Sequence, residues 1–414
     1  MVELWFPYGV SEVAVRVPDE NLVDVLKPRD NAAPELMINL EQVITEDVVT
    51  AAKNAEQICI VIGNSRKKNL ISDTTKSLIA SFANTGVALN KITIIQTPQS
   101  DPIDGLTDLP IIHHSPIDSP TVTLEGSFGD FTPTISKIAA ESKLTIAVGE
   151  LMFHHFTGYA GLCDLIFPGL TSEKTAREEL IRNKPMDPHE LFKERLEVSS
   201  LLQSAYALGI VLKSDMSIAK VSLGHFNDTV NSLTEAVNQM ASVEASKAAE
   251  IVVMSAGGSP FDESLLRTVE AFPAGLSVLK RNGALIVEAE CSLGHGDTDF
   301  YAWSNEHKEV RHLESRLRHR FNYYGWKAAY LLRALTRHRV YLVSGLPDYY
   351  VERTFGLRSA KTMNDALESA QRALGADSSV TVIPNASQII PRLPAQTTEK
   401  PQENDKEHPP QASG

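Results

Sequence analysis

Two adjacent histidines, His154 and His155, stand in the stretch 146–173, beside a glycine-rich turn. An imidazole changes its charge near neutral pH, so either histidine could take up and return a proton. Gly158 and Gly161 would let the backbone approach a ligand closely, because glycine has no Cβ atom. We therefore expect any chemistry of this chain to involve this stretch, whereas a helix-capping or buried structural pair is the alternative interpretation.

The element that must position the histidines is the apolar run 144–148, which predicts a buried strand closed by Gly149. The residues that follow would form a loop at the carboxyl end of that strand. Open α/β sheets place their ligand crevice there, because polar side chains can point into a cleft while the sheet stays buried. We therefore expect the two histidines to lie in such a crevice.

Two further predicted strands, 58–62 and 91–96, also end in polar loops. The first loop contains Arg66, whose guanidinium could bind a carboxylate or phosphate through two parallel hydrogen bonds. A solvated loop face is the alternative interpretation of its three cations. The second loop contains Ser100, which is a candidate for binding substrate. Because all three strand ends could line one crevice, we expect Arg66 and His154 to face the same cleft.

A second α/β unit begins at the predicted strand 251–254. Gly257 and Gly258 follow it, and a glycine turn between a strand and a helix can present backbone amides to an anion. The pattern is not G-x-G-x-x-G, so it does not indicate a Rossmann dinucleotide site. A later strand, 284–289, ends in a loop where His295 stands between two glycines. The glycine turn is a candidate for binding a cofactor, and His295 is a candidate for binding substrate.

Strands alternate with helical patterns through most of the chain. Such alternation predicts an α/β fold, here two α/β domains with mostly parallel sheets around a central cleft. A hairpin over residues 2–17 opens the first domain, 1–245, and an amphipathic helix over 227–248 leads to the second, 246–393. The segment 394–414 contains no large apolar residue, which predicts a disordered tail.

The chain has 414 residues and a formal net charge of -13. That charge argues against a general nucleic-acid or anionic-membrane binder, since both need a basic face. The N-terminus lacks the pattern of a signal peptide, and no apolar run approaches the roughly 18 residues of a membrane span. The three cysteines lack CxxC spacing, which indicates neither a zinc site nor a disulfide framework. We expect a cytoplasmic protein whose partner is a small carboxylate.

The central stretch resembles the H-x-F-x-G-Y-x-G and F-P-G-L-x-S-x-K-T motifs of the nickel-pincer lactate racemase family. The turn 257–262 is similar to the family's G-G-x-P-x-D, and 294–296 to its G-H-G loop. Membership implies two α/β domains around a cleft and a nickel-bearing pyridinium dithio-acid nucleotide. In such proteins the cofactor accepts a hydride from a 2-hydroxy acid and returns it to either face, while two histidines exchange the hydroxyl proton. The matching residues of the first motif are His154, Phe156, Gly158, Tyr159 and Gly161, and those of the second include Phe167, Pro168, Gly169, Lys174 and Thr175.

Only part of the family's chemistry carries over to this chain. Arg66 matches the arginine that binds the substrate carboxylate, and His154 matches one of the two acid–base histidines. Ser100 stands in the place of the other histidine, and an unassisted hydroxyl is too weakly basic at neutral pH to replace an imidazole. Asp164 stands where the family's lysine carries the cofactor, and a carboxylate cannot form that covalent thioamide.

The family's metal-binding histidine is also unmatched, because Leu180 or a neighbour stands in its place and no histidine follows until His189. In the second domain Arg267 and Glu270 fall where the family has a glutamine and a lysine near the cofactor. The resemblance therefore leaves the cofactor of this chain unknown. We predict that the chain does not carry the covalent nickel-pincer nucleotide and does not racemise lactate by that route.

Three functional hypotheses remain open. The chain could be an isomerase or racemase with a rebuilt site for a small 2-hydroxy carboxylate, using His154 as base, Arg66 as clamp, and Asp164 or His155 as second group. It could be a non-catalytic relative that binds a small carboxylate or pairs with an active paralogue. It could also bind the nickel nucleotide non-covalently and racemise a 2-hydroxy acid. Each hypothesis is compatible with a homo-oligomer.

Overall fold

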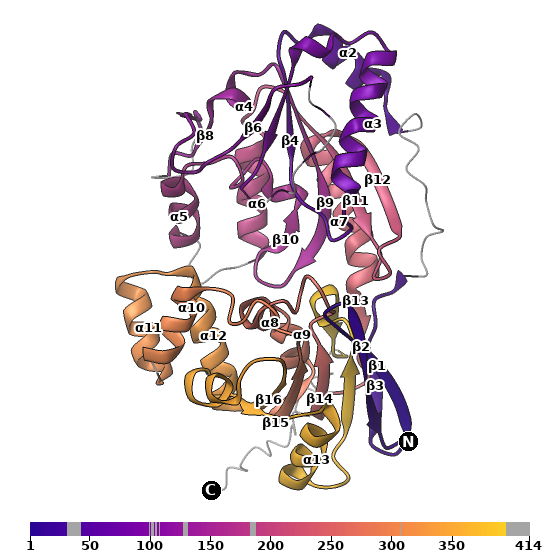
Figure 1. Cartoon of the computed structure of the whole chain (residues 1–414), viewed down its shortest axis with the longest axis vertical. Helices are drawn as coiled ribbons and strands as arrows, with labels where there is room; N and C mark the ends of the chain where they lie inside the picture. The colour runs from indigo at the N-terminus through magenta and orange to yellow at the C-terminus, as the bar shows by residue number, and fades with distance from the viewer. Residues whose placement is uncertain are drawn as a thin grey trace, which may run out of the picture.

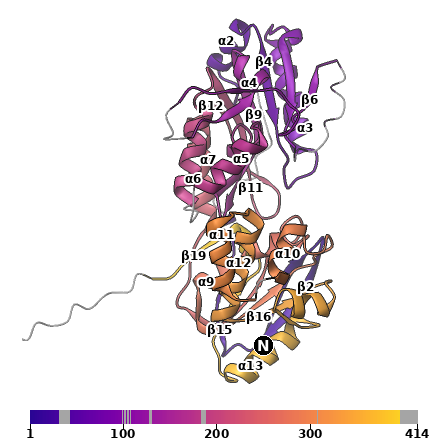
Figure 2. The same cartoon turned by 90° about the vertical axis from the view of Figure 1, so that its left-hand side faces the viewer.

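The computed structural model describes residues 1–30, 43–98, 100, 103, 106, 108–126, 131–182, 188–306 and 308–394. Two bodies, each a sheet flanked by helices, lie one above the other along the long axis of the molecule (Figure 1). The view at right angles shows the same two bodies meeting end to end (Figure 2). The sheets are mostly parallel, so the predicted α/β fold is confirmed.

The sheet of the first domain has the strand order β12-β11-β9-β4-β5-β6, with β10 paired to β9. Its strands are parallel to their neighbours except β10 and β12, which are antiparallel. A separate antiparallel pair, β7 with β8, lies beside it. The strands are β4 (Ile58–Ile62), β5 (Ile92–Gln96), β6 (Ile111–His113), β7 (Thr121–Thr123), β8 (Thr134–Ser136), β9 (Leu144–His154), β10 (Gly158–Gly161), β11 (Ala205–Leu212) and β12 (Ile218–His225).

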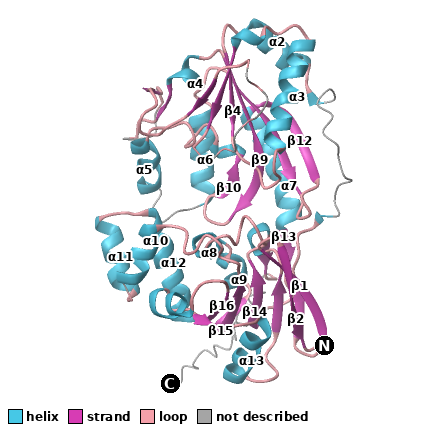
Figure 3. Ribbon diagram, viewed as in Figure 1, coloured by secondary structure: helices cyan, strands magenta, loops and turns pink. Residues whose placement is uncertain are grey.

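Helices cover both faces of this sheet (Figure 3). Every residue of β4 is buried, because Ile60 packs towards one layer of helices and Val61 towards the other. A strand buried on both faces is mostly apolar, which explains why an unbroken apolar run predicted β4 correctly. The helices of this domain are α2 (Glu46–Asn54), α3 (Leu70–Asn84), α4 (Lys137–Glu141), α5 (Glu173–Arg182), α6 (Pro188–Ser199) and α7 (Phe226–Ala241).

The sheet of the second domain has the strand order β17-β16-β15-β14-β18-β3, and all of its pairs are parallel. Its strands are β3 (Leu22–Val25), β14 (Ala249–Ser255), β15 (Leu279–Glu288), β16 (Arg339–Val343), β17 (Arg358–Ser359) and β18 (Val380–Ile383). Its helices are α8 (Leu265–Glu270), α9 (Phe272–Ser277), α10 (Thr298–Glu306), α11 (Val310–His319), α12 (Tyr323–Arg337) and α13 (Met363–Leu374).

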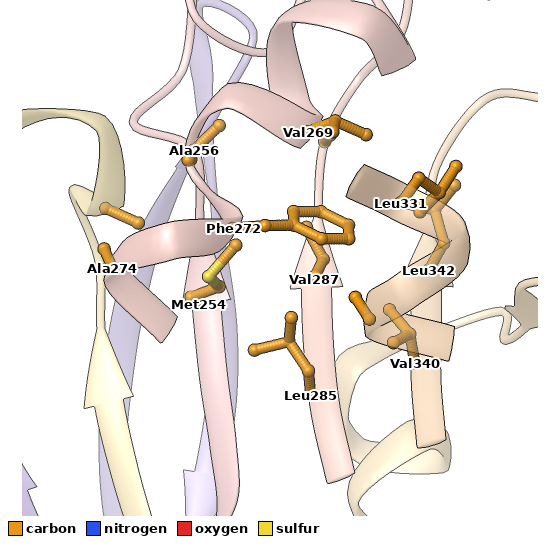
Figure 4. Close-up of a cluster of buried hydrophobic side chains, with 14 of the residues drawn as sticks. Met254, Ala256, Val269, Phe272, Ala274, Leu285, Val287, Leu331, Val340 and Leu342 are labelled. Atoms are coloured by element: carbon orange, nitrogen blue, oxygen red, sulfur yellow. The ribbon is translucent and has the colours of Figure 1, made fainter. Parts of the chain in front are cut away.

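A large apolar cluster fills one face of the second sheet (Figure 4). Phe272 of α9 lies among Met254 of β14 and Leu285 and Val287 of β15, and all four side chains are fully buried. Burying such side chains contributes about 1.5–3 kcal/mol each relative to leaving them exposed. This cluster fixes the position of α9 and, just before it in the chain, of α8.

The N-terminal hairpin corrects the predicted boundary between the domains. β1 (Val2–Tyr8) and β2 (Ser11–Val17) pair antiparallel as predicted. Phe6, however, is buried in a cluster with Ile251 and Val253 of β14, and β3 pairs with β18. The first 25 or so residues therefore lie with the second sheet, not with the 1–245 unit to which their place in the chain assigned them.

The helix predicted over 227–248 also ends earlier than expected. α7 ends at Ala241, and β13 (Ser242–Glu244) then pairs in parallel with β19 (Ile390–Arg392). The backbone of Ser242 is extended, and from there the chain leaves the first domain and enters the second. No helix in the described ranges is long and apolar enough to cross a membrane. The three cysteines are buried and unpaired. The predicted disordered tail lies outside the described residues, apart from Pro394.

Glu288, at the end of β15, is a buried acid with an unusual environment. Its side chain is 1% exposed, and neither carboxylate oxygen has a hydrogen-bond partner among the described residues. Burial, followed by the nearby carboxylate of Asp262, raises the pKa of Glu288 to about 8. Glu288 is therefore largely protonated in the folded protein at neutral pH.

We expect Glu288→Gln to remove a pH dependence of stability. The folded chain keeps this proton where the unfolded chain, with an ordinary carboxyl pKa, has released it. The free energy of unfolding of the native protein should therefore fall, by roughly 2 kcal/mol or more, as the pH rises from about 5 to about 8. Urea unfolding across that range measures the fall, and exposed Glu352→Gln serves as the control. An equal fall in Glu288→Gln would contradict the assignment.

Candidate functional site

A cleft with a volume of about 740 Å³ lies between the two domains. The first domain contributes the loop after β4 and the end of β9. The second contributes the turn after β14, helix α8, and the short 3-10 helix η5 (Ala386–Gln388). The lining residues are Asn64, Ser65, Arg66, Lys68, Asn69, Met152, Phe153, His154, His155, Ser259, Pro260, Phe261, Glu263, Arg267, Glu270 and Ser387.

The strand that carries the two histidines is longer than predicted. β9 does not end at Gly149 but continues to His154, because β10 folds back and pairs with residues 151–154. Gly149 is a packing position within the strand, where a Cβ atom would lie 2.9 Å from the Leu165 side chain. The expected loop is thus the tip of a hairpin that reaches towards the second domain. His154 and His155 both line the cleft, as predicted, but from the end of a strand.

Hydrogen bonds determine the state of the His154 ring. Its Nδ1 accepts from the amides of Phe156 (3.3 Å) and Thr157 (3.2 Å), so this nitrogen carries the lone pair. The proton is therefore on Nε2, which donates to Oε2 of Glu270 at 3.4 Å. Burial and the charge of Lys327 lower the pKa of His154 to about 3. His154 is thus a neutral hydrogen-bond donor at physiological pH, and its proton-accepting nitrogen is occupied, so it is not the catalytic base that the sequence predicted.

Glu270 joins His154 to a buried lysine of the second domain. Its Oε1 forms an ion pair with Nζ of Lys327, whose side chain is only 2% exposed. The Lys327 ammonium lies 4.5 Å from the ring centre of Tyr323 and 5.7 Å from that of Phe156. Burial and nearby Arg267 lower the pKa of Lys327 to about 7. The result is a polar chain, Lys327–Glu270–His154, that crosses from one domain to the other.

Sequence reasoning missed Lys327 entirely. Lys327 stands on α12 in register with Leu331 and Ala334, which are both buried. A lysine on the apolar stripe of an amphipathic helix is the one signal that could have identified it. Glu270 attracted notice only as a departure from the family pattern.

His155 makes a contact between the domains. Its Nε2 donates to the carbonyl oxygen of Ala386 at 3.0 Å, and its ring lies edge-on to Phe153 with centres 4.7 Å apart. Burial lowers the pKa of His155 to about 4, so its ring is neutral. This geometry fits a positioning role at the interface better than the predicted role of second catalytic group.

Arg66 lines the cleft together with His154, as expected, but its charge is already balanced. Its Nε donates to Oε1 of Glu150 at 2.5 Å, and its Nη2 donates to the carbonyl oxygen of Leu212 at 3.1 Å. The Arg66 side chain is 4% exposed and that of Glu150 is fully buried. A ligand carboxylate would therefore meet a guanidinium that is shared with a buried acid.

Asp164 lies in a different ion network. Its Oδ1 accepts from Nη1 of Arg195 at 2.6 Å, and its Oδ2 accepts from the amide of Gly161 at 3.1 Å. Arg195 also donates through Nε to Oε1 of buried Glu179 at 2.6 Å. Asp164 is not among the described residues that line the cleft. Its predicted catalytic role is not supported, because its carboxylate is committed to Arg195.

The remaining predicted site residues also lie outside the described walls of the cleft. The Ser100 hydroxyl donates to the carbonyl oxygen of Thr97 at 2.8 Å, within its own loop. His295 donates from Nδ1 to the carbonyl oxygen of Asp297 at 3.0 Å, and its ring lies against Tyr301 with centres 5.1 Å apart. The structure therefore brings neither residue together with His154.

The glycine turn after β14 is occupied by the protein itself. The amide of Gly257 donates to Oγ of Ser255 at 3.0 Å, and the amide of Ser259 donates to the carbonyl oxygen of Gly9 at 2.9 Å. Gly258 has a φ of 71°, and a Cβ atom there would lie 2.9 Å from the same Gly9 oxygen. Glycine is thus required at Gly258 by the close approach of the β1–β2 turn. The predicted cofactor-binding role of Gly257 and Gly258 is not supported, since the cleft begins only at Ser259.

The residues present do not fit the covalent nickel-pincer nucleotide. Asp164, at the position of the tethering lysine, and Glu179, beside the position of the metal-binding histidine, are joined through Arg195. The two positions are therefore close in space, but a closed ion network takes the place of an amine and an imidazole. Among the described residues no group of three or more His, Cys, Asp or Glu side chains is arranged to hold a metal ion.

The fold and the site define a two-domain α/β protein with a cleft between two mostly parallel sheets. Residues 243–390 match the family model described as the lactate racemase C-terminal domain. Lactate racemase of Thermoanaerobacterium thermosaccharolyticum is 26% identical over 439 aligned residues, which cover 95% of this chain and all of that protein. Lactate racemase of Lactiplantibacillus plantarum is 28% identical over 271 residues, which cover 62% of this chain and 63% of that protein. The chain is therefore similar to a lactate racemase over 95% of its length, and its C-terminal part matches the C-terminal domain of that family.

Solved structures agree on the fold. The lactate racemase apoprotein from T. thermosaccharolyticum superposes with a TM-score of 0.83 at 24% identity, covering 94% of this chain and 100% of that one. A protein from Thermotoga maritima superposes with a TM-score of 0.58 at 12% identity, covering 85% of this chain and 99% of that one. At these identities the likeness establishes the architecture alone.

We expect Arg195→Met to destabilise the first domain strongly. The substitution removes the guanidinium from between Asp164 and Glu179 and leaves the Glu179 carboxylate buried without its arginine. Breaking a buried ion pair from one side costs about 3–5 kcal/mol. Denaturant unfolding measures the loss, and Lys193→Met on the same helix, whose side chain is 69% exposed, should cost less than about 0.5 kcal/mol. Equal effects of the two substitutions would contradict the network's importance.

Proposed function

We propose that the chain is a racemase-type isomerase that acts on a small 2-hydroxy carboxylate in the cleft between its domains. The observation that carries this proposal is the chain of contacts Lys327–Glu270–His154. One domain supplies a neutral imidazole, and the other supplies a carboxylate backed by a buried amine. The similarity to lactate racemases supports the racemase-like class of reaction.

Glu270 is the proposed proton acceptor, because its carboxylate lines the cleft. His154 supplies a neutral N–H, which can polarise a substrate oxygen without being consumed as an acid. Lys327 holds Glu270 from behind, and its lowered pKa lets it share the proton near neutral pH. A base and a fixed donor are the groups needed to move a proton on a carbon or oxygen next to a carboxylate.

The substrate carboxylate is assigned to the cationic side chains of the cleft walls. Arg66 remains the proposed clamp, because no partner for its Nη1 is found among the described residues. Lys68 and Arg267 line the same cleft, and Arg267 pairs with Glu263 at 2.5 Å. The positive charges of Arg66 and Arg267 are therefore partly neutralised by nearby glutamates. A site with this reduced positive charge favours a small anion over a highly charged one.

A non-catalytic role in binding a small carboxylate or an active paralogue is the second candidate. It is favoured by the two amides that occupy Nδ1 of His154 and by the ion pair of Arg66 with Glu150. Both arrangements commit groups that a catalyst would use. Binding without turnover distinguishes this candidate from the first.

Deuterium exchange at C2 of 2-hydroxy acids tests the proposed activity. In D₂O, NMR on a panel of these acids should show exchange into at least one of them with the native chain. Glu270→Gln should slow this exchange at least about 100-fold, because it removes the proton acceptor. Glu263→Gln, on the same wall of the cleft, should change it only a few-fold.

Two results would overturn the proposed activity. One is exchange by Glu270→Gln at the native rate. The other is calorimetric binding of an acid from the panel without any exchange, which would support the non-catalytic candidate.

The chain should remain unmodified when it is co-expressed with enzymes that make the nickel-pincer nucleotide. The reason is that the Asp164 carboxylate cannot form the thioamide tether and is held by Arg195. Intact-mass measurement together with metal analysis checks this expectation, with an authentic lactate racemase as the positive control. An added mass of nucleotide plus nickel, accompanied by lactate turnover, would contradict it. Nickel without added mass would instead indicate non-covalent binding.

A further inference from the structure

A second pocket lies on the second domain, away from the cleft, at the edge of the sheet where β16 begins. Its volume is about 470 Å³. The end of α12 and the first residues of β16 form one side, and Asn282 of β15, Gly356 and Arg358 form the other. The cleft, in contrast, is reached from the ends of β9 and β14. The pocket therefore lies at the amino ends of the strands of the second sheet, and the cleft lies at their carboxyl ends.

Three arginines are among the residues that line this pocket: Arg337, Arg339 and Arg358. None of the described residues that line it is an aspartate or glutamate. The arginines form no ion pair with any described residue either, although the whole chain has a net charge of -13. In an acidic protein, three guanidinium groups without acidic partners around one hollow favour an anionic ligand.

Local structure accounts for only part of this charge. Arg337 is in the last turn of α12, where a cation is favourable beside the free carbonyl groups of a helix end. Arg339 and Arg358 are strand residues, so the charge of a helix end does not explain their presence. Arg339 donates one hydrogen bond, from Nη1 to the carbonyl oxygen of Asn282 at 3.1 Å, which leaves most of its donors for another group.

His338 lies in the same wall as Arg337 and Arg339. Its Nδ1 is buried and has no hydrogen-bond partner among the described residues, so this nitrogen is not itself a contact for a ligand in the open pocket. The donors that the pocket offers are therefore those of the three arginines.

We propose that this pocket binds a small phosphorylated molecule. Guanidinium groups hold phosphate oxygens through paired hydrogen bonds, and three of them match a ligand that carries several negative charges. The volume is within the range of about 300–1,000 Å³ that small-molecule sites occupy. The ligand is distinct from the substrate of the cleft, because the site does not share any residue with it.

Calorimetry on the full chain with pyrophosphate as the probe tests the site. The native protein should bind pyrophosphate, and the double variant Arg337→Gln, Arg358→Gln should bind it at least about ten-fold more weakly. Both side chains are exposed, so the fold should be retained, and each single variant should show a smaller loss in the same direction. Exposed Arg318→Gln, on α11 outside the pocket, changes the net charge without touching the site and should bind as the native chain does.

Three outcomes would overturn the proposal. The native chain could fail to bind pyrophosphate, or the double variant could bind it with native affinity. Citrate could also bind as tightly as pyrophosphate, which would replace a phosphate site by a general polyanion site. None of these results bears on the proposed activity in the cleft, because the pocket and the cleft share no lining residue. For the same reason, Glu270→Gln should leave pyrophosphate binding in the pocket unchanged.

Discussion

The pairing of β10 with the end of β9 is the interaction on which the rest of the site depends. It extends a parallel strand beyond the edge of its own sheet, so that His154 and His155 contact the second domain. The return of the chain depends on Gly161, where a Cβ atom would collide with the carbonyl oxygen of Glu150. One local hairpin thereby brings an imidazole to a carboxylate that belongs to the other domain.

Charge inside the first domain is neutralised by the protein itself. Arg66 is paired with Glu150, and Arg195 is paired with both Asp164 and Glu179. Taking such ions out of water costs several kcal/mol each, and close geometry with further hydrogen bonds must offset that cost. At Asp164 this chain therefore has a closed, hydrogen-bonded ion network that balances its own charges.

The sequence predicted the strands, which depend on local apolar runs, but not the contacts between residues that are distant in the chain. The apolar runs predicted most strands, because a strand covered on both faces consists mostly of apolar residues. Gly149 was misinterpreted as the end of a strand, since its contact with Leu165 exists only in the folded domain. Lys327 was missed for the same reason, because its partner Glu270 stands on another helix. The predicted cleft was found, yet most of its polar chemistry comes from pairs that are distant in the chain.

The placement of β3 beside β18 has a consequence for how the chain folds. In chain order, β3 of the second sheet comes before all the elements of the first domain. The other strands of the second sheet begin only at Ala249. The first domain is therefore an insertion within the second. During synthesis the N-terminal hairpin must wait, with the apolar side of Phe6 and Val15 uncovered, until β14 and α13 emerge. A fragment limited to residues 243–390 would lack this hairpin and would leave the matching face of its sheet open to water. The first domain can close early, whereas the second can reach its native state only when both ends of the chain are present.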